Sequence, residues 1–168
     1  MVKKKFEKIC MIGMPGSGKS TIGRALSDHL KYDFYDIDEQ IEIDSKSKIK
    51  DIFIKEGEEH FRKLERSIFK KLILKKKIVV STGGGIILKN QDLLNQTFNI
   101  YLKCDLETLI KRTSRNKNRP LLKNNVEKNI KILFNDRKEI YNEASDFTIN
   151  ATSNTQKTIK TILGHLNQ

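Results

Sequence analysis

The stretch Gly13-Met14-Pro15-Gly16-Ser17-Gly18-Lys19-Ser20 decides the fold of this chain. It fits the pattern G-x-x-x-x-G-K-[ST] and lies between a short apolar run and a stretch with helical spacing. Glycines lack a Cβ, so successive backbone N–H groups can approach phosphate oxygens at a helix N-terminus. Lys19 adds a mobile positive charge, and the Ser20 hydroxyl is placed to bind Mg²⁺. The stretch therefore predicts a phosphate-binding P-loop and a nucleoside triphosphate ligand.

The composition favours one domain with a substantial core, because the chain has 168 residues. Its 33 Lys and Arg against 21 Asp and Glu give a net charge of +12, which could indicate nucleic acid or an anionic membrane. The lysines, however, are spread along the whole chain, and few aromatic side chains accompany them. We expect neither a nucleic-acid nor a membrane partner. Part of the charge is better used to bind ATP and an anionic second substrate.

The two cysteines, Cys10 and Cys104, show no spacing typical of a metal site or a disulfide framework. We interpret them as reduced, half-buried apolar residues. No apolar run approaches the roughly 18 residues of a membrane helix, and no signal-peptide pattern follows the basic N-terminus. These features predict a cytoplasmic protein.

Five apolar segments with the character of strands alternate with segments of helical spacing. This alternation predicts an α/β fold: a parallel sheet covered by helices on both faces. One expected helical region, residues 39–56, is interrupted at residues 45–47, and another begins at Glu58. The expected strands lie near residues 9–12, 34–38, 78–80, 98–102 and 147–149.

Two acidic residues end the second expected strand. If the strand persists to Asp38, then Asp36 and Asp38 point to the same face, because side chains alternate along a strand. Ligands of α/β sheets bind at the carboxyl ends of strands, so the pair would lie near the P-loop. The alternative is an acidic N-cap of the next helix.

The third expected strand ends in Ser81-Thr82-Gly83-Gly84-Gly85, where an ordinary P-loop protein carries a metal-binding Asp. That carboxylate must come from elsewhere, and Asp36 is the best-placed candidate. Three glycines at the end of a strand suggest close approach to a ligand, and a merely flexible turn is the alternative.

Two arginines cannot be placed by periodicity alone. Arg62 lies within reach of Glu58 and Glu65, so a surface ion pair is the favoured interpretation. Arg137 falls on the apolar face of its helix, where it either needs a partner or extends to water. Between these helices, residues 113–125 form a polar connection typical of a mobile lid over phosphates.

Taken together, these motifs resemble the shikimate kinase family, small P-loop kinases of the nucleoside monophosphate kinase type. The resemblance runs from Lys8 to the last helix, and no motif position departs from the family's pattern. Its six motifs are G-x-P-G-S-G-K-S-T-I-G-R at 13–24, F-x-D-x-D at 34–38, G-E-x-x-F-R-x-x-E at 57–65, S-T-G-G-G at 81–85, R-P-L-L at 119–122 and R-x-x-x-Y at 137–141.

The resemblance implies transfer of the γ-phosphoryl group of ATP to the 3-hydroxyl of shikimate, on the pathway to chorismate and aromatic amino acids. It implies a three-layer α/β/α fold whose five parallel strands have the order 2-3-1-4-5. We expect one domain over residues 1–168, a substrate-binding segment at about 37–65, the lid at about 113–125, and a monomer. Another small-molecule kinase, for gluconate or a nucleotide, is the nearest alternative, and a regulatory P-loop module or nucleic-acid-binding ATPase is a more distant one.

The resemblance also implies roles for individual residues. Those expected to act in catalysis are Lys19, Asp38 and Arg119. Those expected to bind ATP are Gly16, Ser17, Gly18, Lys19, Ser20, Thr21, Arg112 and Arg119. Mg²⁺ is assigned to Ser20 and Asp36. Shikimate is assigned to Asp38, Arg62, Gly83, Gly84, Gly85 and Arg137.

Overall fold

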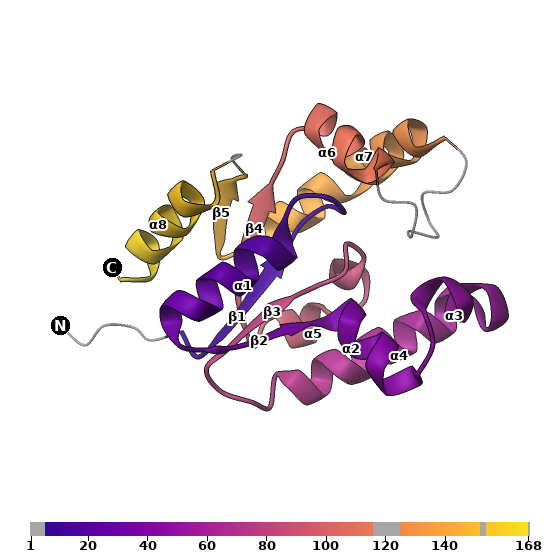
Figure 1. The fold of residues 1–168 in the computed structure, drawn as a ribbon, viewed down its shortest axis with the longest axis horizontal. Coiled ribbons are helices and arrows are strands. Elements are labelled where there is room, and N and C mark those ends of the chain that lie inside the picture. Colours follow the sequence, from indigo (N-terminus) through magenta and orange to yellow (C-terminus); the bar gives the residue numbers. More distant parts are fainter. Residues whose placement is uncertain (1–5, 116–124, 152–153, 168) are drawn as a thin grey trace.

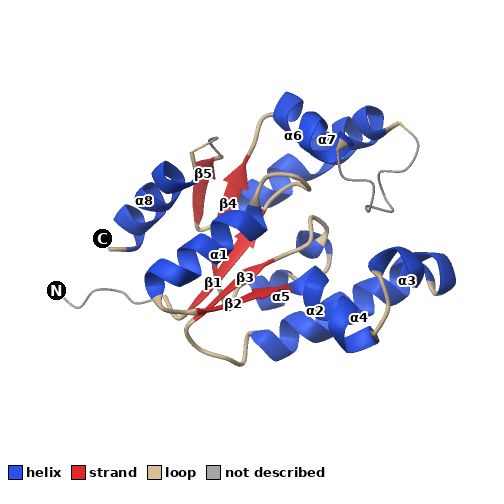
Figure 2. Ribbon diagram, in the orientation of Figure 1, coloured by secondary structure: helices blue, strands red, loops and turns tan. Residues whose placement is uncertain are grey.

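A computed structural model of the chain describes residues 6–115, 125–151 and 154–167 (Figure 1). One or more helices follow each strand along the chain (Figure 2). In order they are β1 (Lys8–Ile12), α1 (Lys19–Leu30), β2 (Asp33–Asp36), α2 (Ile37–Ser45), α3 (Ile49–Lys55), α4 (Gly57–Leu72), β3 (Ile78–Ser81), the 3₁₀ helix η1 (Ile86–Leu88), α5 (Gln91–Leu94), β4 (Phe98–Lys103), α6 (Leu106–Ser114), α7 (Val126–Ala144), β5 (Phe147–Asn150) and α8 (Thr155–Leu166).

The strands form one sheet in the order β2-β3-β1-β4-β5, and every neighbouring pair is parallel. This confirms the expected α/β class and strand order. Parallel strands require crossover connections, and the helices supply them. The carboxyl ends of the strands consequently lie at one edge of the sheet, where ligands of such folds bind.

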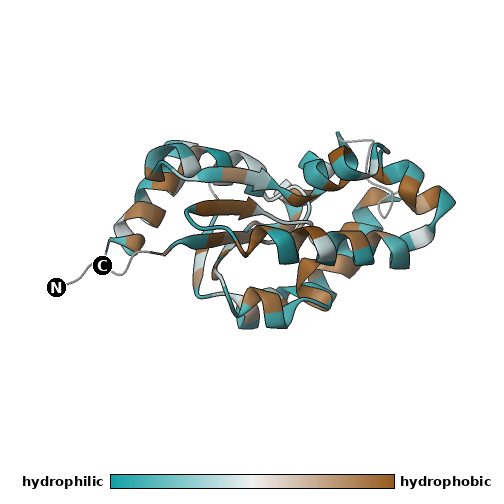
Figure 3. Ribbon diagram, turned by 90° about the horizontal axis from the view of Figure 1, so that it is seen from below, coloured by the Kyte–Doolittle hydropathy of each residue, from teal (hydrophilic) through white to brown (hydrophobic). Residues whose placement is uncertain are grey.

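The hydrophobic core lies in two layers, one on each face of the sheet, as the alternation of side chains along a strand requires. On β1, Ile9 and Met11 pack with α1 and α8, whereas Cys10 and Ile12 pack on the opposite face with α4 and α7. All four side chains are buried. Figure 3 shows the hydrophobic strands between the two helical layers, so the expected three-layer arrangement is confirmed.

The second strand is shorter than expected. It ends at Asp36, whose carboxylate accepts hydrogen bonds from the backbone N–H groups of Asp38 (3.0 Å) and Glu39 (3.3 Å) and so caps α2. The expectation that the strand persists to Asp38 is wrong, and the alternative of an acidic N-cap is confirmed. The physical reason is that a carboxylate at this position satisfies N–H groups that the first turn of a helix leaves without partners.

Two other boundaries can be compared with expectation. The predicted interruption at residues 45–47 is confirmed, because α2 ends at Ser45 and α3 begins at Ile49. The polar connection expected from residue 113 begins later, since α6 continues to Ser114 and the Thr113 hydroxyl donates to the Leu109 carbonyl within that helix. Among the described residues, no helix is both long and apolar enough to cross a membrane.

Candidate active site

The P-loop follows β1 and leads directly into α1. Gly16 and Gly18 have φ angles of 83° and 97°, in the left-handed region that favours glycine, so the loop can curl back over the helix N-terminus. Lys19 is buried, and its Nζ donates to the Met14 carbonyl at 2.9 Å. The Ser17 hydroxyl is also buried and has no hydrogen-bond partner among the residues that the structure describes. The loop thus gathers polar donors at the end of the central strand.

Asp36 lies beside the P-loop. Its Oδ2 accepts a hydrogen bond of 2.5 Å from the Ser20 hydroxyl, at the start of α1. The Ser81 hydroxyl, at the end of β3, lies 3.0 Å from the same Ser20 oxygen. The register of the sheet explains this cluster, because Asp36 on β2 pairs with Ser81 on β3. The end of β3 thus carries a serine, and the adjacent strand β2 places the Asp36 carboxylate in the same cluster.

The three glycines after β3 pass close to several polar groups. A Cβ at Gly83 would lie 2.9 Å from Oε1 of Glu65 and 3.2 Å from Oδ1 of Asp38, and one at Gly85 would lie 2.5 Å from the Arg62 guanidinium. Gly84 faces Pro15 of the P-loop in the same way, at 2.8 Å. A side chain at any of these positions would displace its neighbours, so the glycines let the segment approach these protein groups closely. It joins the P-loop to α2 and α4.

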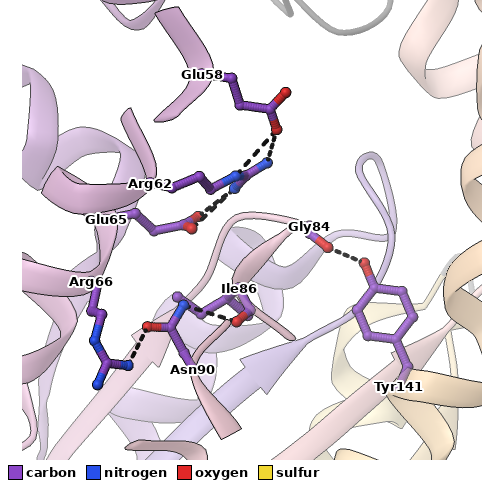
Figure 4. Close-up of polar contacts among 8 residues, drawn as sticks. All are labelled: Glu58, Arg62, Glu65, Arg66, Gly84, Ile86, Asn90 and Tyr141. Atoms are coloured by element: carbon purple, nitrogen blue, oxygen red, sulfur yellow. Dashed lines mark hydrogen bonds and ion pairs between the residues drawn. The ribbon is translucent and has the colours of Figure 1, made fainter. Parts of the chain in front are cut away.

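Arg62 extends from α4 between two carboxylates (Figure 4). Its guanidinium donates to both oxygens of Glu65 at 3.0 and 3.1 Å and to Glu58 at 3.0 and 3.3 Å. The Arg62 side chain is only 12% exposed and Glu65 is fully buried, so this is more than the surface ion pair that periodicity favoured. Burial raises the pKa of Glu65, and the nearby Asp38 adds to the rise, whereas Arg62 opposes it. Arg62 is thereby held in one orientation at the glycine segment.

Arg137 is buried on α7, and the alternative in which its side chain extends into water is not what the structure shows. Its charge acts on Glu65 of α4 and on Tyr141, one turn further along α7. The Tyr141 hydroxyl donates to the Gly84 carbonyl at 2.5 Å (Figure 4). Asp38, Arg62 and Arg137 therefore converge on the glycine segment from three helices.

The remaining residues expected at the nucleotide are divided between described and undescribed parts of the chain. Arg112 on α6 donates to the carbonyls of Gly16 and Ser17 at 3.3 and 3.4 Å, so it lies against the P-loop. Thr21 is exposed in the first turn of α1. Arg119 lies outside the described residues, and its role at the phosphates stays a prediction.

Two hydroxyl groups of the site received no role from the sequence. In the sequence, Ser81 was considered only because a P-loop protein usually carries a metal-binding Asp after this strand. Tyr141 was considered only as the last residue of the motif R-x-x-x-Y. The signal for Ser81 was its place at the carboxyl end of a buried strand, next to the strand of Asp36. No local signal could have found the contact of Tyr141, because it joins residues 57 positions apart.

The fold and the site together define a P-loop kinase, in which the glycine segment and the polar side chains around it lie beside the P-loop. The family model described as shikimate kinase matches residues 15–167. A shikimate kinase from Clostridium botulinum (strain Okra) is 45% identical over 150 residues, which cover 86% of this chain and 88% of the relative. The chain belongs to the shikimate kinase family.

Solved structures agree with this assignment. The shikimate kinase of Acinetobacter baumannii in complex with shikimate has a TM-score of 0.89 and 34% identity, covering 97% of this chain and 96% of its own. The shikimate kinase of Aquifex aeolicus has a TM-score of 0.82 and 37% identity, covering 94% and 95%. Both likenesses extend over nearly the whole chain.

Proposed function

We propose that this chain transfers the γ-phosphoryl group of ATP to the 3-hydroxyl of shikimate, with the residues around the P-loop and the glycine segment in separate roles. The observation that supports this most is the closeness of Gly84 to Pro15 of the P-loop, because the neighbouring glycines of the same segment lie against Asp38 and Arg62. Phosphoryl transfer is largely positioning and charge stabilisation, and this adjacency would place an acceptor beside the γ-phosphate.

Residues 16–21 would bind the phosphates of ATP. The left-handed glycines would let the backbone N–H groups of the loop face an anion, and the buried Ser17 hydroxyl adds a donor that lacks a partner among the described residues. Lys19 would move from the Met14 carbonyl to the phosphates and neutralise charge that develops on the transferred group. Arg112, which contacts the P-loop backbone, would lie near the adenine.

The residues at the end of β2 fit a magnesium ion. Mg²⁺ prefers hard oxygen ligands, keeps several waters and is held by one or two protein groups together with substrate phosphates. The Ser20 hydroxyl and the Asp36 carboxylate supply such oxygens in direct contact. The described residues contain no group of three or more His, Cys, Asp or Glu that could hold a metal by themselves. When bound there, the ion would screen the charge of the β- and γ-phosphates.

Asp38 and the two arginines would hold the acceptor. Shikimate carries one carboxylate and three hydroxyls, and guanidinium groups bind carboxylates with paired hydrogen bonds. Arg62 is preoriented by Glu58 and Glu65, and Arg137 is a buried cation for which a bound carboxylate would be a partner. Asp38 would accept hydrogen bonds from ring hydroxyls and orient the attacking one, with the proton passing to it or to the phosphoryl oxygens. The glycine segment would approach the ring through its backbone.

Several expectations rest on the sequence alone and stay predictions. They are a single domain over residues 1–168, with its substrate-binding segment and lid, a monomer, a cytoplasmic location and no nucleic-acid partner. A salt titration against nonspecific DNA tests the last of these, because binding driven by the +12 charge would weaken steeply with added salt.

A coupled ADP-release assay with three classes of acceptor tests the proposed function. Shikimate should release one ADP per molecule consumed in the presence of MgATP, and gluconate and nucleoside monophosphates should release none above background. Phosphorus NMR of the product should show the phosphate on the 3-hydroxyl. ADP release without shikimate dependence, or with another acceptor only, would refute it.

A further inference from the structure

The Tyr141 hydroxyl is the feature of the site that the proposed roles leave unused. Tyr141 is fully buried on α7, and its hydroxyl donates to the carbonyl of Gly84, the middle residue of the glycine segment. Its ring stacks on that of Tyr101 from β4, with centroids 5.1 Å apart. Packing therefore holds the ring, and the hydrogen bond to Gly84 ties the hydroxyl to the glycine segment.

Gly84 is the middle residue of the glycine segment, so its position determines where the segment lies relative to the surrounding side chains. Its neighbour Gly83 lies against Asp38 and Glu65, its neighbour Gly85 lies against Arg62, and Gly84 itself packs on Pro15 of the P-loop. The Ile86 N–H donates to the Gly83 carbonyl at 3.2 Å and closes the turn. A shift of Gly84 would therefore change the distance of the P-loop from Asp38 and Arg62.

Tyr141 also lies on the same helix face as Arg137, because residues four apart on a helix are neighbours. Both side chains are buried, and the Arg137 charge acts on the Tyr141 hydroxyl. The bond from Tyr141 to Gly84, drawn in Figure 4, thus connects the helix that carries Arg137 to the glycine segment. That segment lies against Arg62 and Asp38.

We propose that Tyr141 is a positioning residue for the acceptor: its hydroxyl holds the Gly83–Gly85 segment at a fixed distance from Arg137. This inference rests on the proposed function for its kinetic consequence, but its structural consequence can be measured without any substrate. The hydroxyl, and not the ring, carries the role, because the stacking on Tyr101 does not need it.

The variant that isolates the hydroxyl is Tyr141→Phe, which keeps the aromatic stack and leaves the buried Gly84 carbonyl without its donor. Tyr101→Phe is the matched control, since it removes a hydroxyl from the other buried ring of the same stack and leaves the bond to Gly84 intact. In steady-state assays, Tyr141→Phe should raise the KM for shikimate on the order of tenfold, as expected from an unsatisfied buried acceptor, with the KM for ATP changed less than about twofold. Tyr101→Phe should leave both constants near those of the wild type.

Amide hydrogen exchange without substrate provides the second readout. The Ile86 amide, which closes the glycine turn, should exchange faster in Tyr141→Phe than in the wild type and in Tyr101→Phe. If the Ile86 amide exchanges faster in Tyr141→Phe but the wild type does not phosphorylate shikimate, the proposed function is refuted and the structural inference stands. Wild-type exchange and wild-type KM values in Tyr141→Phe, with only a lower melting temperature, would overturn the inference, because Tyr141 would then be a packing residue alone.

Discussion

Asp36 and Ser20 lie in direct contact, with 2.5 Å between the carboxylate Oδ2 and the hydroxyl oxygen, and they join the end of β2 to the first turn of α1. The other oxygen of Asp36 is occupied by the N-terminal N–H groups of α2. One carboxylate thus caps the N-terminus of α2 with one oxygen and contacts Ser20 at the end of the P-loop with the other. The prediction that this carboxylate takes the place of a metal-binding Asp after β3 follows from that position.

Asp36→Asn should raise the Mg²⁺ concentration required for half-maximal activity, because an amide oxygen is a weaker ligand than a carboxylate. The amide oxygen can still cap α2, so the fold should persist. Activity measured against free Mg²⁺ at saturating ATP checks this. Asp33→Asn, at the exposed opposite end of the same strand, is the control and should not change the requirement. An unchanged Mg²⁺ requirement in Asp36→Asn would remove this residue from the metal site.

Asp38→Asn should act on transfer and not on the nucleotide. Asp38 lies at the glycine segment, with Oδ1 at 3.2 Å from the position of a Cβ on Gly83. Loss of the carboxylate should lower kcat by about 10²- to 10⁴-fold, the range of a positioned acid–base group, with ATP affinity unchanged by calorimetry. Glu39→Gln, one residue further on the exposed side of α2, should be near wild type. If Asp38→Asn shifts only the Mg²⁺ dependence, its acceptor role is wrong.

Glu65 should make the free energy of unfolding fall as the pH rises, which is the opposite of the usual effect of a carboxylate in an ion pair. Burial raises its pKa above the ordinary value of 4.5, although Arg62 opposes the rise. A carboxyl group with a raised pKa in the folded state makes the protein lose stability as the pH rises from the unfolded pKa through the folded one. The Gln side chain of Glu65→Gln cannot ionise, so the free energy of unfolding of this variant should improve relative to that of the wild type as the pH rises above about 4.5.

Urea denaturation at several pH values measures the Glu65 effect. Glu59→Gln is the control, because Glu59 is an exposed carboxylate of the same helix, and its difference from the wild type should change little with pH. If the wild type instead becomes more stable relative to Glu65→Gln as the pH rises, pairing with Arg62 lowers the pKa of Glu65 more than burial raises it.

Arg66 connects α4 to the segment that follows the glycines. Its guanidinium donates to both carboxylate oxygens of Asp92 at 2.9 and 2.7 Å and to Oδ1 of Asn90 at 3.2 Å. Arg66→Lys keeps the charge but loses the planar fork, so the melting temperature should fall by a few degrees at most, as exposed pairs contribute about 1 kcal/mol or less. Lys63→Ala, which breaks an exposed pair within α4, should change it less. A thermal melt in which the two variants coincide would contradict a bridging role for Arg66.

The strand order could be predicted from the motifs, and so could the closeness of those candidate residues that lie at strand ends. The P-loop pattern predicts the conformation of its own residues. The absence of an Asp after β3 indicated Asp36 as the candidate metal ligand, and the sheet places this residue beside Ser81. Asp38 was placed on the wrong element, because strand propensity does not reveal that Asp36 would cap a helix. The surroundings of Arg62 and Arg137 depend on where α4 and α7 pack, and helical periodicity defines a face but not its neighbours.

Binding of the shikimate carboxylate by Arg137 is tested most directly by titration calorimetry with shikimate and its uncharged methyl ester. The wild type and the control Lys138→Ala, exposed on the same helix, should both bind shikimate more tightly than the ester. Arg137→Ala should weaken shikimate binding by about 2 to 5 kcal/mol and lose most of the preference over the ester, because a buried charge pair is removed. Wild-type affinity for shikimate in Arg137→Ala, with the preference over the ester intact, would show that the carboxylate is held elsewhere and would contradict this account of the site.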